Sequence, residues 1–485
     1  MTFIRLNPNY VMKPDTDKVL VMVALNGRNV VEDDTFTDVI HPLYAMILSF
    51  VNGGDVDSCV LRASEYLNVS PSLVKNFIES LLDNPNQVVF KSKEGNSFFP
   101  PRMIVSCEDR FIDNRYIPDM FRYDKAKLCM TRYKEPSSLT LMVNNICVTD
   151  CVYCYEDKSK RVDCCIPLQR IFELIHEAQK LHVVSFDVIG GEFFLYKYWK
   201  EVLGELRKCG YQPYLSSKMC VDEEIVRTLK SLDILDIQMS IDSFVEEHVR
   251  PLLKVKVEYV ERMKQSLRLL EKYGIPVRVH SVLTRFNSSV QDMQSLYEFL
   301  KTLKNVTDWK IVVGDSTLYP RMEYSEMVIS ENALSEQVDY LNSISSESPF
   351  PVHAPSKDHL KDSMSSVDMA IRKKSFFSRA FCSGLFSSLY ILPDGNVTIC
   401  EQLYWHPRFI VGNVKQQSIE EIWNSEKAKS LYNIKQSDIP EDSLCHDCKD
   451  FHACRNLRQL CYRDVVKKYG AKKWYYPDSN CPYVE

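Results

Sequence analysis

Short apolar runs alternate with longer amphipathic stretches from residue 137 onward. The apolar runs predict six strands, at 139–143, 183–189, 212–215, 235–241, 276–283 and 309–313. The amphipathic stretches between them predict five helices, at 167–181, 196–209, 222–232, 257–273 and 288–303. This alternation indicates an α/β fold in which right-handed crossovers build a parallel sheet. The active site of such a sheet lies at the carboxyl ends of its strands.

The first hundred residues carry a different pattern, in which three helical stretches lie between β-rich runs. The β-rich runs are 18–25, 29–31 and 88–90, and Asn26-Gly27 between the first two is a hairpin signal. The helical stretches are 41–50, which Asn52-Gly53-Gly54 ends, 56–67, and 71–82 with Ser70 as its N-cap. This order resembles a winged-helix module. Residues 101–136, which contain three prolines, read as a linker.

Length, charge and hydropathy narrow the classes of protein that fit. The 485 residues suggest about three domains at ~150 residues each. Lys and Arg number 60 against 65 Asp and Glu, so the basic excess typical of a nucleic-acid-binding protein is absent. No apolar run approaches the ~18 residues that span a bilayer, and the first residues lack the apolar core of a signal peptide. We therefore expect a cytoplasmic protein without a nucleic-acid or membrane partner.

Cysteine is the unusual residue, because the chain has 17. Disulfides do not persist in the cytosol, so this many thiols indicate metal ligands rather than cross-links. Three are bunched at 147, 151 and 154, directly after the first predicted strand. Seven more lie near the end of the chain, at 382, 400, 445, 448, 454, 461 and 481.

The bunched cysteines form a three-thiol motif, Cys147-x3-Cys151-x2-Cys154. Such spacing can direct three thiolates at one iron–sulfur cube and leave the fourth iron open. The motif resembles the CxxxCxΦC signature of the radical S-adenosylmethionine (radical SAM) family, with Tyr153 as its aromatic. The resemblance implies that the open iron chelates SAM, and that its reductive cleavage gives a 5′-deoxyadenosyl radical. A zinc knuckle is the alternative, but no His or Cys before Cys164 offers a fourth ligand at short spacing.

Three further strand ends match that family in order. Gly190-Gly191-Glu192 resembles its GGE motif, whose carboxylate accepts from the SAM ammonium group. Ser216-Ser217 stands where relatives usually have Thr-Asn, and Ser240-Ile241-Asp242 matches a Ser-x-Asp pattern. The resemblance thus implies that cofactor binding involves Tyr153, Gly190, Gly191, Glu192, Ser216, Ser217, Ser240 and Asp242. Each element taken alone is equally a turn or a cap.

The C-terminal cysteines resemble the SPASM extension of radical SAM enzymes, which binds auxiliary [4Fe–4S] clusters. The resemblance implies an outer cluster held by Cys445, Cys448, Cys454 and Cys481, and an inner one held by Cys382, Cys400 and Cys461. The family places its next cysteine where this chain has Arg458, so Cys461 is shifted and a fourth inner ligand is not evident. Zinc ribbons that add His446 or His452 are the alternative.

Glu401 is the candidate catalytic residue. It directly follows Cys400, where sulfatase-maturing relatives carry an Asp that takes a proton from the substrate, and a Glu can do the same. A surface Glu on a turn is the structural alternative.

These resemblances define the expected domains. Residues 1–100 would form a winged helix like the recognition element of enzymes that modify ribosomally made peptides (a RiPP recognition element), and residues 101–136 a linker. Residues 137–320 would form a partial (β/α)6 TIM-like radical SAM barrel. A bridging region at 321–375 and a SPASM domain at 376–485 would follow. A recognition element of this kind grips the leader of a ribosomally made precursor peptide, typically by adding a strand to a sheet edge. A structural cap and a DNA-binding winged helix are the alternatives for residues 1–100.

The expected function is oxidative cross-linking of such a peptide. The product is a thioether or a carbon–carbon (or ether) bond, as in cyclophanes. An external one-electron donor such as flavodoxin or ferredoxin is implied. The alternatives are a sulfatase-maturing enzyme that forms formylglycine and a non-catalytic iron–sulfur electron carrier. An open coordination site argues against the carrier, because a carrier gains from closing its cluster.

Overall fold

The computed structural model describes residues 3–24, 36–108, 115–357, 360, 369–379, 381–404 and 406–484. The chain divides into two compact units. Unit 1 comprises Met1–Ser137 together with Leu181–Val184, and unit 2 comprises Ser138–Lys180 together with Ser185–Glu485. No helix of the described residues is both long and apolar enough to cross a bilayer.

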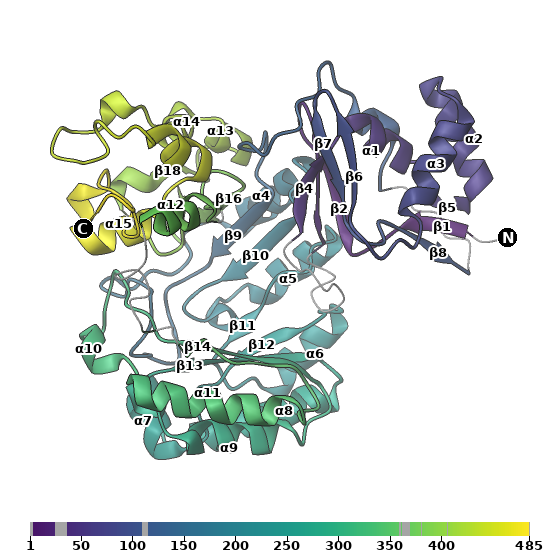
Figure 1. Ribbon diagram of the computed structural model, residues 1–485. Helices are drawn as coiled ribbons and strands as arrows, with labels where there is room; N and C mark the ends of the chain where they lie inside the picture. The colour runs from purple at the N-terminus through teal and green to yellow at the C-terminus, as the bar shows by residue number, and fades with distance from the viewer. Residues whose placement is uncertain are drawn as a thin grey trace. The chain divides into compact units, whose positions relative to one another are not determined.

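Unit 2 contains two five-stranded sheets (Figure 1). The first has the order β10-β9-β16-β17-β18 and the second has the order β11-β12-β13-β14-β15. The strands are β9 (Ser138–Met142), β10 (Ser185–Ile189), β11 (Ser216–Ser217), β12 (Ile237–Ser240), β13 (Val277–Leu283), β14 (Val306–Val313), β15 (Val352–His353), β16 (Ser388–Ile391), β17 (Asn396–Thr398) and β18 (Ile410–Asn413). β9 runs parallel to β10 and β16, and β11 to β15 pair in parallel throughout.

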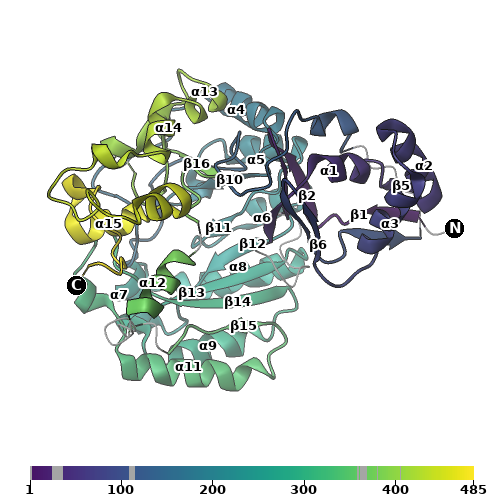
Figure 2. The same ribbon diagram turned by 45° about the horizontal axis from the view of Figure 1, so that its top comes forward.

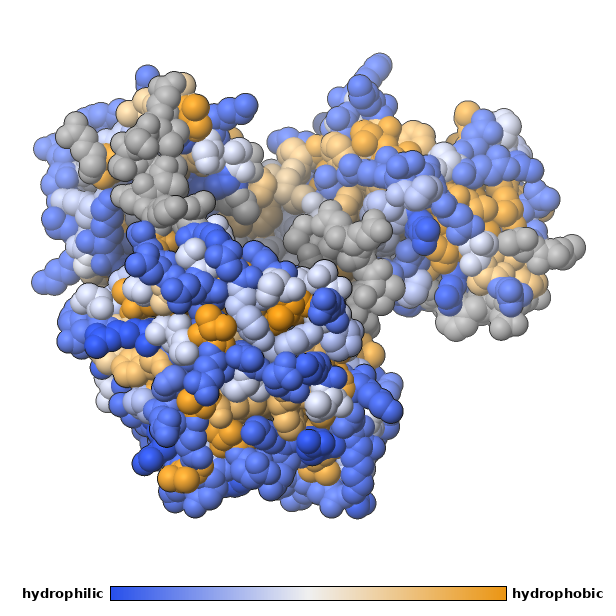
Figure 3. Space-filling model, turned by 60° about the horizontal axis from the view of Figure 1, so that its bottom comes forward, coloured by the Kyte–Doolittle hydropathy of each residue, from blue (hydrophilic) through white to orange (hydrophobic). Residues whose placement is uncertain are grey.

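Helices alternate with the strands of the barrel region, as the sequence predicts. They are α4 (Leu168–Lys180), α5 (Trp199–Lys208), α6 (Glu223–Ser231), α8 (Tyr259–Lys272) and α9 (Val290–Leu300). α7 (Glu246–Leu253), α10 (Tyr324–Met327) and α11 (Glu331–Ser345) were not predicted. α9 and α11 cover the outer face of the second sheet in both ribbon views (Figures 1 and 2). In Figure 3 the outer surface of this part of unit 2 is mainly hydrophilic, with separate hydrophobic spots.

The predicted strand at 212–215 is wrong in position, because the ladder begins only at Ser216. Pro213 has no N–H to donate, and the N–H of Tyr214 donates instead to Asp187 Oδ1 on β10, at 2.7 Å. A side-chain contact thus replaces the ladder between β10 and β11. The six predicted strands therefore lie in two sheets rather than in one, and together they form the expected partial barrel.

Apart from β16, β17 and β18, unit 2 from Met369 onward consists of short helices and loops around the C-terminal cysteines. The helices are α12 (Met369–Phe377), α13 (Ile419–Trp423), α14 (Glu426–Tyr432) and α15 (Tyr462–Tyr469). A π-helical segment, His452–Arg458, contains Cys454 and is separated from Cys461 by two residues.

Unit 1 has the element order helix, strand, helix, helix, hairpin, which is that of a winged helix. These elements are α1 (Pro42–Leu48), β5 (Asn52–Asp55), α2 (Val56–Leu67), α3 (Pro71–Leu81), β6 (Val88–Ser92) and β7 (Gly95–Phe99). Two small sheets accompany them, β5-β1-β8 and β2-β3-β4. Their other strands are β1 (Phe3–Leu6), β2 (Tyr10–Pro14), β3 (Val19–Val23), β4 (Thr37–Ile40) and β8 (Ile104–Cys107).

Unit 1 differs from the sequence-based expectations at two places, and a third expectation lies outside the described residues. Asn52-Gly53-Gly54 does follow the first helix, but it forms β5 on the edge of β1 rather than a free turn. β8, within the segment expected as a linker, pairs with β1, and Phe121 from the same segment is buried in the core of this unit. The Asn26-Gly27 hairpin and the strand at 29–31 lie outside the described residues.

Trp309 joins three strands of the second sheet. It is fully buried on β14, and its Nε1 donates to Ser281 Oγ on β13 at 2.9 Å. The Ser281 hydroxyl in turn donates to the carbonyl of Ile241 at the end of β12. The Trp309 indole therefore fills the core at this point, and its hydrogen bond to Ser281 helps to hold β12, β13 and β14 together.

We predict that Trp309→Ala lowers the free energy of unfolding by about 3–5 kcal/mol, because it leaves a large buried cavity. Chemical denaturation followed by far-UV circular dichroism measures the change. Val257→Ala is the matched control, since Val257 is more than half exposed and should change stability by less than about 0.5 kcal/mol. Equal effects of the two substitutions would contradict this account of the core.

Candidate functional site

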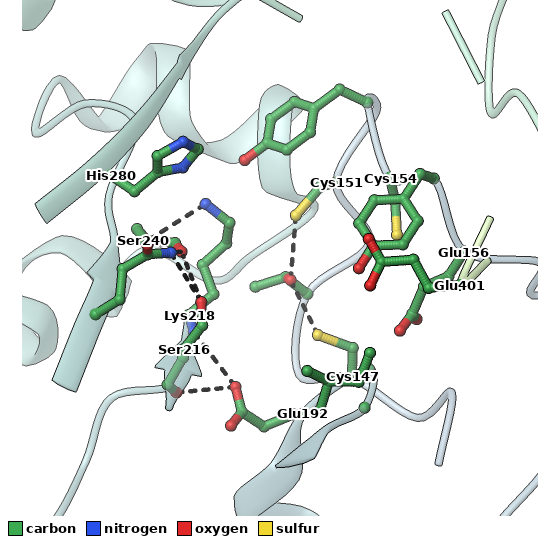
Figure 4. Close-up of a pocket in the computed structure, with 18 of the residues that line it drawn as sticks. Cys147, Cys151, Cys154, Glu156, Glu192, Ser216, Lys218, Ser240, His280 and Glu401 are labelled. Carbon is green, nitrogen blue, oxygen red and sulfur yellow. Dashed lines mark hydrogen bonds between the residues drawn. The ribbon is translucent and has the colours of Figure 1, made fainter. Parts of the chain in front are cut away.

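A cavity of about 530 Å³ lies at the carboxyl ends of the barrel strands (Figure 4). Its walls come from the loop after β9, from the ends of β10, β11, β12 and β13, and from the SPASM segment. All three bunched cysteines line it. Of the other predicted site residues it collects Tyr153, Gly190, Gly191, Glu192, Ser216, Ser217, Ser240 and Glu401. The cavity thus brings together the cysteine loop and the SPASM segment, which are about 250 residues apart in the sequence.

Two buried asparagines shape the start of the cysteine loop. Asn144 Oδ1 accepts from the N–H of Ile146 at 3.0 Å, and Asn144 Nδ2 donates to the Glu192 carbonyl at 3.2 Å. Asn145 Nδ2 donates to the carbonyls of Asp157 and Lys160, at 2.8 and 2.7 Å. These bonds satisfy backbone groups that no helix or sheet partners in this loop. The loop therefore has a fixed path on both sides of the three thiols.

Within the loop, Thr149 lies between two of the thiols. Its hydroxyl is 3.3 Å from Cys147 Sγ and 3.3 Å from Cys151 Sγ (Figure 4). Burial raises the pKa of the Cys151 thiol, and it raises the pKa of Cys154 to about 12. Thiolates at these positions therefore need a cationic metal centre to stabilise them, and metal binding releases their protons.

Gly191 lets two backbones meet beside the cysteine loop. A Cβ at this position would lie 2.5 Å from the carbonyl oxygen of Ile146, which no side chain can tolerate. The Gly191 N–H also donates to the nearby Asn144 carbonyl at 2.8 Å, which holds the two backbones together. The glycine is thus required for the end of β10 to pack against the residues that precede Cys147.

Glu192 is a fully buried carboxylate at the cavity wall. Its Oε2 accepts from Ser217 Oγ at 2.9 Å and from the Lys218 N–H at 3.3 Å, while Oε1 accepts from the Phe194 N–H at 3.4 Å. Burial raises the pKa of Glu192 to about 7, and these hydrogen bonds oppose the shift. A cation bound beside it would hold the carboxylate ionised at neutral pH.

Asp242 does not line the cavity, although the sequence resemblance includes it in the cofactor site. Its Oδ1 accepts from the Val282 N–H at 2.9 Å, and its Oδ2 accepts from the Tyr153 hydroxyl at 2.5 Å. Lys218 Nζ donates to the same Oδ2 at 2.9 Å and lies 5.5 Å from the centre of the Tyr153 ring. Asp242 therefore anchors the aromatic of the cysteine motif, together with a buried cation, to the end of β12.

The remaining strand ends supply neutral polar groups. Ser216 Oγ accepts from Gln238 Nε2 at 2.9 Å and lies 3.4 Å from Ser240 Oγ. His280 on β13 faces the same space (Figure 4). Burial lowers the pKa of His280 to about 4, and the nearby Lys218 ammonium adds to the effect. His280 is therefore a neutral imidazole at physiological pH.

Two carboxylates face the cavity from the side of the cysteine loop and the SPASM segment. Glu401 lines the cavity rather than an open surface turn, and burial raises its pKa. Glu156 lies beside it (Figure 4), and burial raises its pKa to about 7. Glu156 Oε2 is buried without a hydrogen-bond partner. This side of the cavity can therefore accept hydrogen bonds or a proton.

The outer cysteine set surrounds a second, small cavity. Cys445, Cys448, Cys454 and Cys481 all line it. The three cysteines of the inner set are linked through their electrostatics. Cys400 lies close enough to Cys382 for the two thiols to interact electrostatically. Burial is the main cause that raises the pKa of Cys382 and Cys461, and the nearby Asp464 carboxylate raises the pKa of both thiols further.

The spacing of the thiols decides between a single ion and a cluster. A zinc ion about 2.3 Å from each thiolate brings its ligand atoms within roughly 4 Å of one another. Among the described residues, the one His, Cys, Asp or Glu group whose ligand atoms all lie within 4.8 Å is His176, Glu205 and Cys209. None of the cysteine sets therefore gathers three ligand atoms as closely as a single zinc ion requires, which disfavours zinc at these positions.

Several residues of the cavity were not predicted. They are Thr140, Thr149, Tyr155, Glu156, Lys158, Asp187, Ile189, Tyr214, Lys218, Gln238, His280, Val282 and Tyr390. Lys218 directly follows Ser216-Ser217, so its position at a strand end was a usable signal. His280 lies inside a strand, and Glu156 has no motif around it that marks it in one sequence.

Comparisons with known proteins agree with this geometry. Residues 141–300 match the model of the radical SAM superfamily, and residues 382–449 match that of SPASM, an iron–sulfur cluster-binding domain. No curated protein matches the sequence.

Among solved structures, Streptococcus suis SuiB bound to precursor peptide SuiA has a TM-score of 0.65 at 13% identity, covering 99% of this chain and 100% of that one. SuiB bound to S-adenosylmethionine has a TM-score of 0.65 at 12% identity, covering 98% and 99%. Native anSMEcpe with bound AdoMet has a TM-score of 0.46 at 16% identity, covering 70% and 95%.

The chain carries a radical SAM domain and a C-terminal SPASM domain, and it shares its fold with SuiB. The radical SAM domain implies a [4Fe–4S] cluster and SAM, and the SPASM domain implies auxiliary iron–sulfur clusters. This confirms the predicted fold class and cofactors.

We predict that replacing Cys147, Cys151 and Cys154 together by Ala removes about four irons per chain after anaerobic reconstitution. The variant should also form no 5′-deoxyadenosine from SAM under reducing conditions. Iron assay and chromatography measure the two outcomes. Cys165→Ala is the matched control, because Cys165 is an exposed thiol outside the cavity. Persistent SAM cleavage by the triple variant would show that the cluster lies elsewhere.

Proposed function

We propose that this enzyme forms oxidative cross-links in a ribosomally made precursor peptide. The observation that carries the proposal is the fold match over nearly the whole chain, unit 1 included, to a radical SAM enzyme whose structure was solved with its precursor peptide. The large cavity with three thiols, buried carboxylates and neutral polar groups supports it.

Unit 1 is the proposed site of leader binding. A peptide strand can add to the sheet β2-β3-β4 only at β2 or β4, which are its edges. At the β2 edge, the Met12 N–H already donates to the Tyr116 hydroxyl at 2.9 Å. At the β4 edge, the Val23 N–H donates to the Phe36 carbonyl, and the alternation of antiparallel pairs then directs the backbone groups of Thr37 and Val39 away from β3. The Val39 N–H donates to Asp38 Oδ1 at 2.8 Å, and the His41 N–H just after β4 donates to Ser97 Oγ on β7 at 2.9 Å. We therefore assign the leader to the first part of β4, at Thr37, which is exposed.

Within unit 2, the residues that would hold the cofactors are those of the cavity. Cys147, Cys151 and Cys154 would hold the cluster, and Glu192 would accept from the SAM ammonium group. When bound, cluster and SAM supply an adenosyl radical that takes a hydrogen atom from the substrate. Ser216, Ser217 and Ser240 offer hydroxyl groups to the polar parts of SAM, while Gly190 and Gly191 keep the wall free of side chains. Tyr153 is held against the β12 end by Asp242, and so orients the cysteine loop.

Glu401 and Glu156 are the proposed proton acceptors for the substrate radical. Both carboxylates lie at the cavity wall, and burial raises the pKa of both. A carboxylate with a raised pKa takes a proton more readily than an exposed one. Bond formation in a two-electron oxidation releases one proton, and either carboxylate at this wall could accept it.

The proposed partners and location follow from the same function. A one-electron donor such as flavodoxin or ferredoxin would reduce the cluster before each turnover. The chain has a formal charge of −5, so we expect neither nucleic acid nor membrane as its partner, and a cytoplasmic location.

We predict that Thr37→Pro weakens binding of the precursor peptide at least tenfold, which is about 1.4 kcal/mol. The substitution removes an outward N–H and adds a ring where the leader strand would lie, while an edge strand tolerates proline. Isothermal titration of the full-length precursor measures the affinity.

Thr37→Val is the control for this experiment, because it keeps the N–H and should bind the precursor normally. SAM cleavage without precursor should be unchanged in both variants. Normal affinity of Thr37→Pro would remove β4 as the leader site.

We predict that each cross-link lowers the mass of the peptide by about two hydrogens and consumes one SAM. One hydrogen atom leaves to the adenosyl radical, and one proton and one electron leave when the new bond forms. High-resolution mass spectrometry of the product measures the loss. Thiol alkylation then separates the products, since a thioether removes one alkylatable Cys and a carbon–carbon bond removes none. A product of unchanged mass would contradict cross-linking and indicate epimerisation.

A further inference from the structure

A buried arginine lies against the outer cysteine set without an acidic partner. Arg455 directly follows Cys454 in the π-helical segment and is 1% exposed. Its Nη2 donates to Cys445 Sγ at 3.3 Å and to the carbonyls of Tyr475 and Tyr476, each at 2.6 Å. Among the described residues no carboxylate lies within ion-pair distance of it.

The rest of the guanidinium is unsatisfied. Nε and Nη1 of Arg455 are buried and have no hydrogen-bond partner, which leaves three of its five N–H groups unused. An arginine cannot lose its proton in a protein, and each buried unpaired donor costs about 1–3 kcal/mol. A cation in this position therefore needs an anion, and Arg455 lines the same small cavity as Cys445, Cys448, Cys454 and Cys481.

A second arginine, two residues after the end of α12, reaches the same set. Arg379 Nη2 lies 3.4 Å from Cys454 Sγ and donates to the Gln459 carbonyl at 2.8 Å. Its guanidinium stacks on the Phe376 ring, 3.9 Å from the ring centre. Two different thiols of the outer set thus each have a guanidinium N–H directed at the sulfur.

We propose that Arg455, assisted by Arg379, is the counter-ion of the outer auxiliary cluster and raises its reduction potential. Four thiolates around a cube leave a net negative charge, and reduction adds one more. A buried positive charge and N–H···S hydrogen bonds stabilise the reduced form more than the oxidised form. The outer cluster is thereby poised to accept an electron rather than to donate one. This inference rests on the assignment of the four cysteines to one cluster.

The test is a potentiometric titration of the full-length protein, followed by electron paramagnetic resonance. The Cys147, Cys151 and Cys154 triple Ala background leaves only the auxiliary clusters. The signal that Cys448→Ala/Cys481→Ala removes is that of the outer cluster. If this double substitution removes no iron and no signal, then the four cysteines do not form the site, and the counter-ion proposal falls with it.

We expect Arg455→Met to lower the reduced-to-oxidised ratio of the outer cluster at least tenfold at the parental midpoint, which is 59 mV for one electron. Arg455→Lys, which keeps the charge, should recover most of this shift. Arg379→Met should shift the midpoint in the same direction by less. Lys429→Met is the matched control and should change nothing, because it removes a half-exposed cation of α14.

Two results would overturn the proposal. One is an unchanged midpoint in Arg455→Met with full iron content. The other is loss of the cluster in both Arg455→Met and Arg455→Lys, which would assign a packing role to the side chain. Loss of the cluster in Arg455→Met alone would support the proposal, since the charge would then be needed for assembly.

Discussion

The contact between Gly191 and Ile146 is the constraint on which the site depends. Only a residue without a Cβ permits it, because the carbonyl oxygen of Ile146 lies 2.5 Å from where that atom would be. It brings the end of β10 against the chain that enters the cysteine loop. Glu192 follows one residue later and reaches Ser217 on β11, so the same contact sets the carboxylate opposite the thiols.

Buried charge organises both metal-binding regions, in different ways. In the barrel, Lys218 is paired with Asp242, and the Tyr153 hydroxyl completes the group. The charges of Lys218 and Asp242 balance each other without any cofactor, and Tyr153 ties the cysteine loop to this pair before a cluster binds. In the SPASM domain, Arg455 has no such acidic partner and keeps unused N–H groups. The first arrangement has its charges paired within the protein, whereas the second leaves a cation for a bound anionic group.

The strand and helix pattern of the barrel could be predicted because amphipathic periodicity is local. The segment at 212–215 could not, since the partner of Tyr214 is a side chain on another strand. The cysteines were visible through spacing, and Glu192, Ser216 and Ser240 through their places at strand ends. Glu156 and His280 reach the cavity through tertiary packing, which no spacing records, whereas Lys218 directly follows the strand end at Ser216-Ser217. The pairing of β5 with β1 is of the same kind, because the two strands, Phe3–Leu6 and Asn52–Asp55, lie far apart in the sequence.

The central claim is that the three thiols of the barrel hold a cluster whose open iron binds SAM. Electron–nuclear double resonance on the reduced enzyme tests it directly, with SAM that carries ¹⁵N in its amino group and ¹⁷O in its carboxylate. The auxiliary cysteines can be replaced so that one cluster remains. The account predicts hyperfine coupling of both labels to that cluster. A fully assembled cluster that shows no coupling to either label in the presence of saturating SAM would contradict it.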